Sequence, residues 1–407
     1  MPNAGRDAHN LRLDNPEAAL AERGPHLFFV LAAAHGSVVL LLWILAYRLR
    51  WADPIQPVMW HAHEMVYGFA AAGLAGIVAA LVPNWSGRTP ASCGRLGFLA
   101  ALWLAGRIAM MAASFLPAWT MAAIDLAFLP TFAALIISPV ATARPARSVP
   151  LWALFLVLFA GNAAMHADAL GGGTYAIAEH GARIGLDVYL LLLTAIGGRA
   201  IPYLTLCFFK SRGLRFKPRA SAVLETLAIV SVAAYLAVDA LAGMSTATSV
   251  VALAAALVSG IRLWLWRGYR VRGAPSLMML HIGYLWMVVG FLLEAAAPVM
   301  GGVADMAAIH VLTAGAIGTV LLTVMTRESL IHRRLDLAGG RRIMTAYALV
   351  TLAVVLRVVA LFVPGTFVNL VIASGITWAF GFLVLLTNYL PILGTVPHRL
   401  SNGPNAN

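Results

Sequence analysis

The sequence is poor in charged residues and has almost no cysteine. Only 11% of its 407 residues are Asp, Glu, Lys or Arg, whereas a soluble domain carries about a quarter. The two cysteines, Cys93 and Cys207, are far apart and belong to no Cys-x-x-Cys pair. This argues against a zinc ribbon, an iron–sulfur cluster and covalently attached c-type haem. We also find no convincing internal repeat, no low-complexity tract and no soluble domain.

Long apolar runs dominate the chain instead. Hydrophobic residues make up 61% of it, and each run can cross a hydrocarbon core of roughly 30 Å as a helix. These runs must be helical, because the backbone N–H and C=O groups find no water in lipid and have to form hydrogen bonds with each other. The sequence predicts an all-α, polytopic transmembrane bundle of about twelve spans: 27–47, 61–83, 94–114, 119–142, 149–168, 183–209, 221–241, 246–266, 276–297, 303–327, 342–363 and 366–391.

Positive charge alternates between the loops that join these spans. Lys and Arg gather after the even-numbered spans and are absent near 115–118, 242–245, 298–302 and 364–365, although Arg48 and Arg50 break the pattern in the first outer loop. Because Lys and Arg stay in the cytoplasm, we predict a cytoplasmic segment over 1–26, one transmembrane domain over 27–393 and a cytoplasmic tail over 394–407. The net charge of +12 then reflects loops facing an anionic leaflet of the lipid bilayer, not nucleic-acid binding.

The segment Trp60-His61-Ala62-His63-Glu64-Met65 is the most informative part of the chain. Ionisable side chains are costly in a membrane and usually have a function there. Three more histidines, His166, His281 and His310, lie in other apolar runs. Since imidazole is a common ligand of both haem and copper, we interpret these five histidines as candidate metal ligands. The alternative is that they cap or bridge helices by hydrogen bonding.

The predicted topology places four of these histidines at a similar depth. His61 and His63 lie at the outer mouth of span two, His166 at the outer end of span five, and His310 roughly 10 Å into span ten. We therefore expect the four to converge on one outer-half site. His281 lies roughly 10–15 Å below His310. We assign His281 to a separate inner site, because this gap is too large for one axial pair.

Helical geometry adds detail around the motif. Residues two apart point about 200° away from each other on a helix, so His61 and His63 can share a metal only if residue 61 is still extended. Otherwise the two serve different sites. Glu64 and Asp168 are close to candidate ligands in sequence, and a carboxylate commonly fixes the tautomer of a ligating histidine. We expect both carboxylates to play that supporting role.

Arginines inside the predicted spans also need partners. Arg107 lies in the outer half of span three, Arg199 well inside span six, and Arg357 in span eleven is a similar case. Guanidinium pairs well with carboxylate, so haem propionates are natural partners for Arg107 and Arg199. The alternative is a salt bridge to an intramembrane carboxylate: Asp125, Asp187 or Glu294.

Six segments of the sequence together match one known family. They are His61–Met65 with Gly68-Phe69, Pro83–Arg88, Gly197–Pro202, Leu280–Tyr284, His310–Gly318 and Tyr389–Leu393. Taken together they resemble the NnrS family, and they run from span two to span twelve. The resemblance implies a bacterial inner-membrane protein that contains haem b and copper and acts in the response to nitric oxide, usually beside denitrification or nitrosative-stress genes. Positions that match family histidines are His61, His63, His166, His281, His310 and His332.

Two classes of function are compatible with these residues. In the first, the protein binds or converts nitric oxide at a histidine-ligated metal. It would then be a membrane oxidoreductase whose electrons come from quinol or a separate carrier. The sequence has no His-His pair for copper, which argues against oxidase chemistry. In the second, it is a transporter or metal-handling permease that protects iron or copper pools. Paired interrupted helices are typical of transporters, and Gly197-Gly198 with Pro202 offers one interruption.

Overall fold

The computed structural model describes residues 16–49, 57–87, 89–138, 145–219, 221–332, 335 and 340–394. Within these ranges the chain forms helices and loops without a strand, and twelve helices are long and apolar enough to cross a membrane. The predicted all-α transmembrane bundle is therefore confirmed. Much of the predicted cytoplasmic segment and nearly all of the tail lie outside the described residues, and the side on which the termini lie stays a prediction.

The helices follow the predicted spans closely, with some spans built from several consecutive segments. In chain order they are α2 (Pro16–Leu49); α3 (Pro57–His63), η1 (Glu64–Ala70) and α4 (Ala71–Ser86); α5 (Cys93–Met111); α6 (Ala118–Leu126), α7 (Phe128–Phe132) and η3 (Ala133–Ile137); α9 (Pro145–His166); α10 (Tyr175–Leu192), η4 (Leu193–Gly197) and α11 (Gly198–Ser211); α12 (Ala222–Ala242); α13 (Thr246–Leu265); α14 (Pro275–Met300); α15 (Gly302–His310), η6 (Val311–Gly318) and α16 (Thr319–His332); α17 (Arg341–Phe362); and α18 (Phe367–Gly394).

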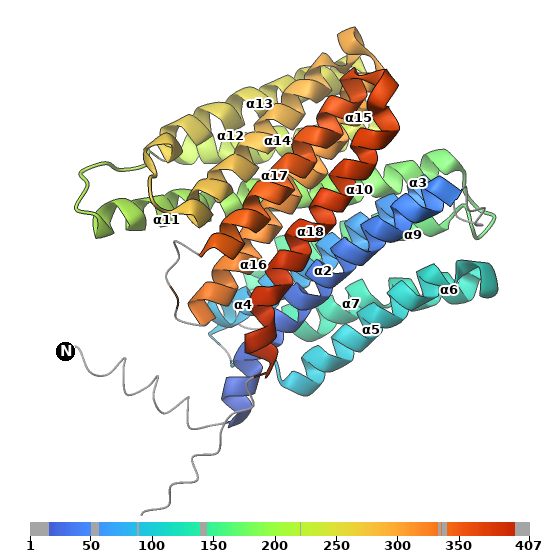
Figure 1. Cartoon of the computed structure of the whole chain (residues 1–407), viewed down its shortest axis with the longest axis horizontal. Helices are drawn as coiled ribbons and strands as arrows, with labels where there is room; N and C mark the ends of the chain where they lie inside the picture. The colour runs from blue at the N-terminus through green and yellow to red at the C-terminus, as the bar shows by residue number, and fades with distance from the viewer. Residues whose placement is uncertain are drawn as a thin grey trace, which may run out of the picture.

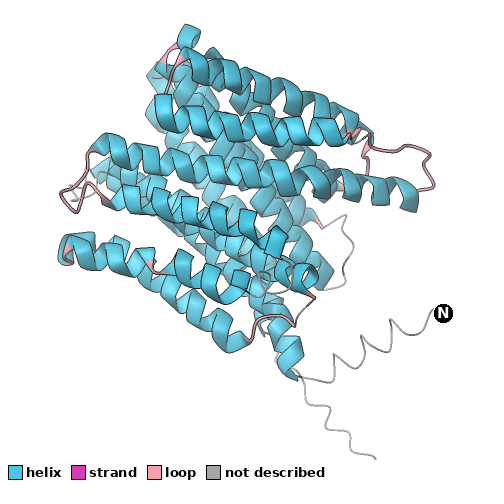
Figure 2. Ribbon diagram, turned by 180° about the vertical axis from the view of Figure 1, so that it is seen from behind, coloured by secondary structure: helices cyan, strands magenta, loops and turns pink. Residues whose placement is uncertain are grey.

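The spans lie side by side with a common tilt (Figure 1). The helices α12, α13 and α14 form one flank of the bundle, and α5, α6 and α7 form the opposite flank. Between them, α18 packs against both α17 and α2, and Figure 2 shows the same bundle from behind. The segments α3, α6 and α15 lie toward one end, whereas α11 projects at the other. This arrangement places the starts of spans two, four and ten at a common depth.

Four spans change from α-helical to π-helical geometry: η1, η3, η4 and η6. Such segments are rare and often occur at functional sites. Two of them, η1 and η6, begin directly after His63 and His310. The interruption predicted at Gly197-Gly198 is such a change of helix type, since both residues keep helical dihedrals. It is not an unwound segment.

Candidate metal centre

His61 and His63 lie on one helical turn and face different neighbours. Residues 57–63 form α3, so the extended start that would let both bind one metal is absent here. His63 is buried beside α6 and α9, whereas the ring of His61 packs on Trp43 of α2, with ring centroids 4.8 Å apart. The two histidines therefore belong to two separate groups of residues.

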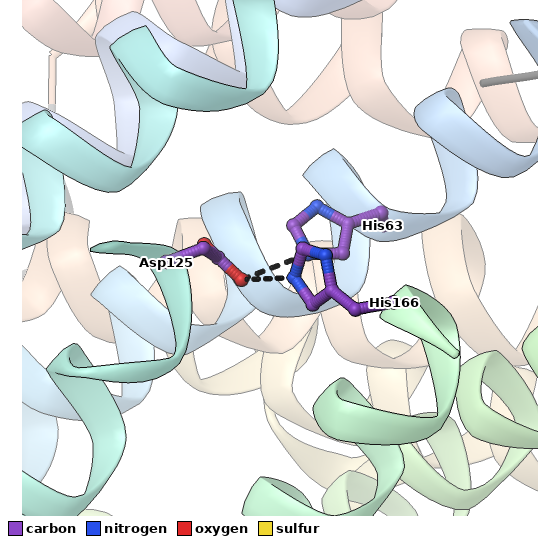
Figure 3. Close-up of side chains that lie close together, drawn as sticks. All are labelled: His63, Asp125 and His166. Carbon is purple, nitrogen blue, oxygen red and sulfur yellow. Dashed lines mark hydrogen bonds and ion pairs between the residues drawn. The ribbon is translucent and has the colours of Figure 1, made fainter. Parts of the chain in front are cut away.

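The first group joins His63 to Asp125 of α6 and to Asn162 and His166 of α9. His63 Nε2 lies 3.1 Å from Asp125 Oδ2 and 3.0 Å from Asn162 Oδ1, and His166 Nε2 lies 2.9 Å from the same Asp125 Oδ2. Figure 3 shows both imidazoles converging on one carboxylate. One ligand atom from each of His63, Asp125 and His166 lies within 4.8 Å of the others. One metal ion could therefore bind all three.

Glu64 and Arg107 surround this group with a buried ion-pair network. Glu64 Oε1 lies 3.0 Å from His63 Nδ1 and accepts a hydrogen bond from Arg107 Nη1 at 2.6 Å. Arg107 Nη2 donates to Asp125 Oδ1. His35 Nε2 is 2.9 Å from Glu64 Oε2, although the contact lacks hydrogen-bond geometry. Arg107 thus takes the alternative partner, a carboxylate of the chain, and holds Glu64 and Asp125 around His63.

Tyr67 is a neighbour of this group that the sequence analysis missed. Its ring centroid lies 5.7 Å from that of His63, and its hydroxyl donates to Gly181 O at 2.6 Å. The sequence feature that could have identified Tyr67 is its spacing of four residues from His63, which places both side chains on one helical face. Gly161 and Gly185 let neighbouring helices approach Tyr67 closely, since a Cβ at either position would collide with its side chain.

A small cavity of about 50 Å³ adjoins the first group. His63 and His166 line it, together with four methionines and the exposed residue Asp168. Asp168 was expected to support His166, but the carboxylate at His166 Nε2 is Asp125. The methionines come from four different segments: Met59, Met110, Met121 and Met165. We refer to this space as the methionine cavity.

The second group consists of His61, His310 and Arg357 of α17. His310 Nδ1 donates to Met306 O at 2.8 Å, and His310 interacts electrostatically with both His61 and Arg357. Among the described residues, His61 Nδ1 and Arg357 Nη1 are buried without a hydrogen-bond partner. Buried polar atoms are seldom left unpaired, so both atoms fit a bound group that would engage them.

His281 lies apart from both groups. Its Nε2 is 2.9 Å from Thr205 Oγ1, and that hydroxyl donates to Ile201 O. The imidazole therefore donates through Nε2, and its Nδ1 is an acceptor that is buried without a hydrogen-bond partner among the described residues. Gly268 packs directly against this nitrogen, and Trp266 lies edge-on to the ring. The imidazole is thus held by protein contacts on several sides.

Depth also separates His281 from His310. His281 lies 19 residues before the end of α14 and His310 lies 8 residues after the start of α15, a difference of roughly 16 Å at 1.5 Å per residue. Arg199, considered as a partner of a haem propionate, is exposed. A buried guanidinium in this half of the chain is that of Arg262, which pairs with Glu225 and donates to the hydroxyl of Tyr284, three residues after His281.

A further ion-pair network in the second half of the bundle was not predicted. Arg183 of α10 donates to both carboxylate oxygens of Asp305, at 2.7 and 2.9 Å. Its Nη1 atom also lies 3.9 Å from Asp239 Oδ1 and 4.0 Å from Glu294 Oε1. Asp187 interacts electrostatically with Arg183, Asp239 and Glu294. Asp187 and Glu294, considered as alternative partners of Arg107 and Arg199, thus interact with Arg183.

The chain was compared with known proteins. A family model described as "NnrS protein" matches residues 19–396. No match was found among curated proteins. The match extends over both groups of histidines, His281 and all twelve spans.

Proposed function

The chain belongs to the NnrS family, and from this premise we propose that it is a haem- and copper-binding protein of the bacterial inner membrane. It acts in the response to nitric oxide and binds or converts nitric oxide, or a related species, at a histidine-ligated metal. The observation that carries the proposal is the buried convergence of His63, Asp125 and His166 within a membrane-spanning bundle. Ionisable residues at such depth are costly and mark functional sites.

Copper fits the first group of residues. Imidazole suits copper as a ligand, and two imidazoles and a carboxylate lie within reach of one ion. Glu64 accepts from His63 Nδ1, which leaves Nε2 for a metal. Arg107 fixes Asp125 from the other side through Oδ1. When bound, copper would supply a redox-active centre for nitric oxide, and these residues would hold its ligands in place.

Haem b fits the second group. The backbone bond of His310 Nδ1 fixes the ring and leaves Nε2 as the nitrogen that can ligate iron. His61 offers a second imidazole, with its Nδ1 buried and unpaired among the described residues. The free Nη1 of Arg357 suits a haem propionate. When bound through one of these imidazoles, haem would supply an iron that can bind nitric oxide; held by both, it would serve electron transfer instead. A second haem at His281 stays a prediction, as does electron supply by quinol.

Metal analysis and optical spectra of the purified full-length protein test this proposal, with and without nitric oxide. His63→Ala and His166→Ala should lose copper and keep haem, whereas His61→Ala and His310→Ala should lose haem and keep copper. His180→Ala is a matched control, because His180 also makes a hydrogen bond from Nδ1 to the carbonyl oxygen four residues earlier. A wild-type protein without haem and copper would overturn the proposal and favour the permease.

A further inference from the structure

We infer that the site of His63, Asp125 and His166 takes monovalent copper, which reaches it through the methionine cavity. The inference rests on the copper site proposed above and adds the oxidation state and the route. Two independent observations support it. The first is the chemistry of the cavity lining, and the second is the fixed charge around the site.

The lining of the cavity is unusually rich in thioether sulfur. Methionine accounts for 15 of 407 residues in the chain, yet for four of the ten residues that line this cavity. Thioether is a soft ligand that suits Cu(I), whereas hard cations such as Mg²⁺, Ca²⁺ and Mn²⁺ prefer oxygen ligands. Met110 and Met121 are almost fully buried, at 2% exposure each, whereas Met59 and Met165 are partly exposed. Sulfur therefore extends from the protein interior toward the surface.

Methionine can also serve as a flexible filler of apolar cores. That explanation does not account for the polar groups that share the cavity with the four methionines. His63 and His166 line it from inside, and exposed Asp168 lines it as well. A lining that combines thioethers, imidazoles and a carboxylate offers several ligands to a cation.

The cavity lies where an ion could enter from outside the bundle. Asp168, Ala169 and Tyr175 line it, and all three are exposed. They follow the end of α9 or begin α10. The predicted topology assigns this loop to the outer side of the membrane. The carboxylate of Asp168 would attract a cation there, and the methionines lie beside the two imidazoles.

The fixed charge around the site also favours a monovalent ion. Metal-bound imidazoles are neutral, so the first group carries the carboxylates of Glu64 and Asp125 and one guanidinium, that of Arg107. His35 contacts Glu64 and is counted here as neutral. The net charge of these side chains is then −1, the sum of two carboxylates and one guanidinium. A monovalent ion brings this sum to zero. A divalent ion leaves one positive charge inside the membrane, which is costly.

The test compares metal uptake by the full-length protein and by a variant with all four cavity methionines changed to leucine. Leucine has a similar volume and such exchanges are well tolerated in cores. Under anaerobic conditions we expect the rate of Cu(I) transfer from a chromophoric chelator to fall at least tenfold. Occupancy at equilibrium should be kept, because the imidazoles remain. The variant Met279→Leu/Met325→Leu, which changes buried methionines elsewhere, is the matched control.

Several results would overturn the inference. One is an unchanged transfer rate in the fourfold leucine variant, and another is Zn²⁺ displacing Cu(I) at equal concentration. If that variant does not fold, Met59→Leu/Met165→Leu carries the same test with a smaller expected slowing. If His63→Ala and His166→Ala retain copper, the copper site proposed above is itself refuted. An unaltered rate combined with copper loss in those alanine variants would reject only the methionine route.

Discussion

Replacement of Arg107 by leucine should strongly destabilise the protein, because Arg107 forms two buried ion pairs. The guanidinium is 5% exposed and pairs with two carboxylates, Glu64 and Asp125. Leucine would leave both buried carboxylates without a guanidinium and in contact only with the imidazoles of His35, His63 and His166. Removing one partner of a buried pair costs about 3–5 kcal/mol. We therefore expect a loss of at least this order in Arg107→Leu, read as a lower unfolding midpoint of the detergent-purified protein by circular dichroism.

A double-mutant cycle makes this prediction sharper, because the effect of Glu64→Gln should change sign. In the wild type it removes a partner of Arg107 and destabilises the protein. In the Arg107→Leu background it removes a buried charge that has lost its guanidinium partner and should restore part of the loss. Arg215→Leu is the control, since Arg215 is exposed in the loop after α11 and surface changes stay within about 0.5 kcal/mol. A cycle in which the two changes simply add would refute the electrostatic argument.

Three further predictions use other parts of the fold. Arg183→Leu should lower stability by more than about 2 kcal/mol, because it leaves Asp305, Asp239 and Glu294 without their shared cation, and a thermal shift no larger than that of Arg215→Leu would contradict it. Gly185→Val should destabilise by about 1–3 kcal/mol through overpacking against Tyr67, with Gly172→Val, where a Cβ meets open space, as the control in the same assay. Reporter fusions after residues 244 and 301 should be active in the periplasm and one after 144 should not; the reverse pattern would reject cytoplasmic termini.

The number and order of the spans could be predicted because apolar run length is a local property of the sequence. One instructive difference is the start of span six, predicted at 183 and found at Tyr175. The extra turns contain Glu179 and His180 and lead to Arg183, so composition alone suggested a loop. Arg183 finds its partners on α12, α14 and α15. A polar residue can remain in a spanning helix when another helix provides its counter-charge.

The depth of the histidines could also be predicted, whereas their grouping could not. Depth depends on position along a helix, which the sequence gives directly. Grouping depends on the rotation of each helix about its axis, which is set by packing against its neighbours. His166 illustrates the difference, because its carboxylate partner is Asp125, which lies 41 positions away, and not the nearby Asp168. Asn162 could not be identified as a site residue from the sequence, because a single amide in an apolar helix belongs to no recognisable motif.

The short helix α3 explains why histidines two residues apart contribute to two groups. Because residues 57–63 are helical, His61 turns toward α2, α15 and α17, and His63 turns toward α6 and α9. The π-helical segment that follows begins with Glu64, which contacts His63 and Arg107. Span two therefore belongs to both groups, and a shift of α3 that moves one imidazole moves the other. This shared helix gives the two proposed metal sites a direct physical link.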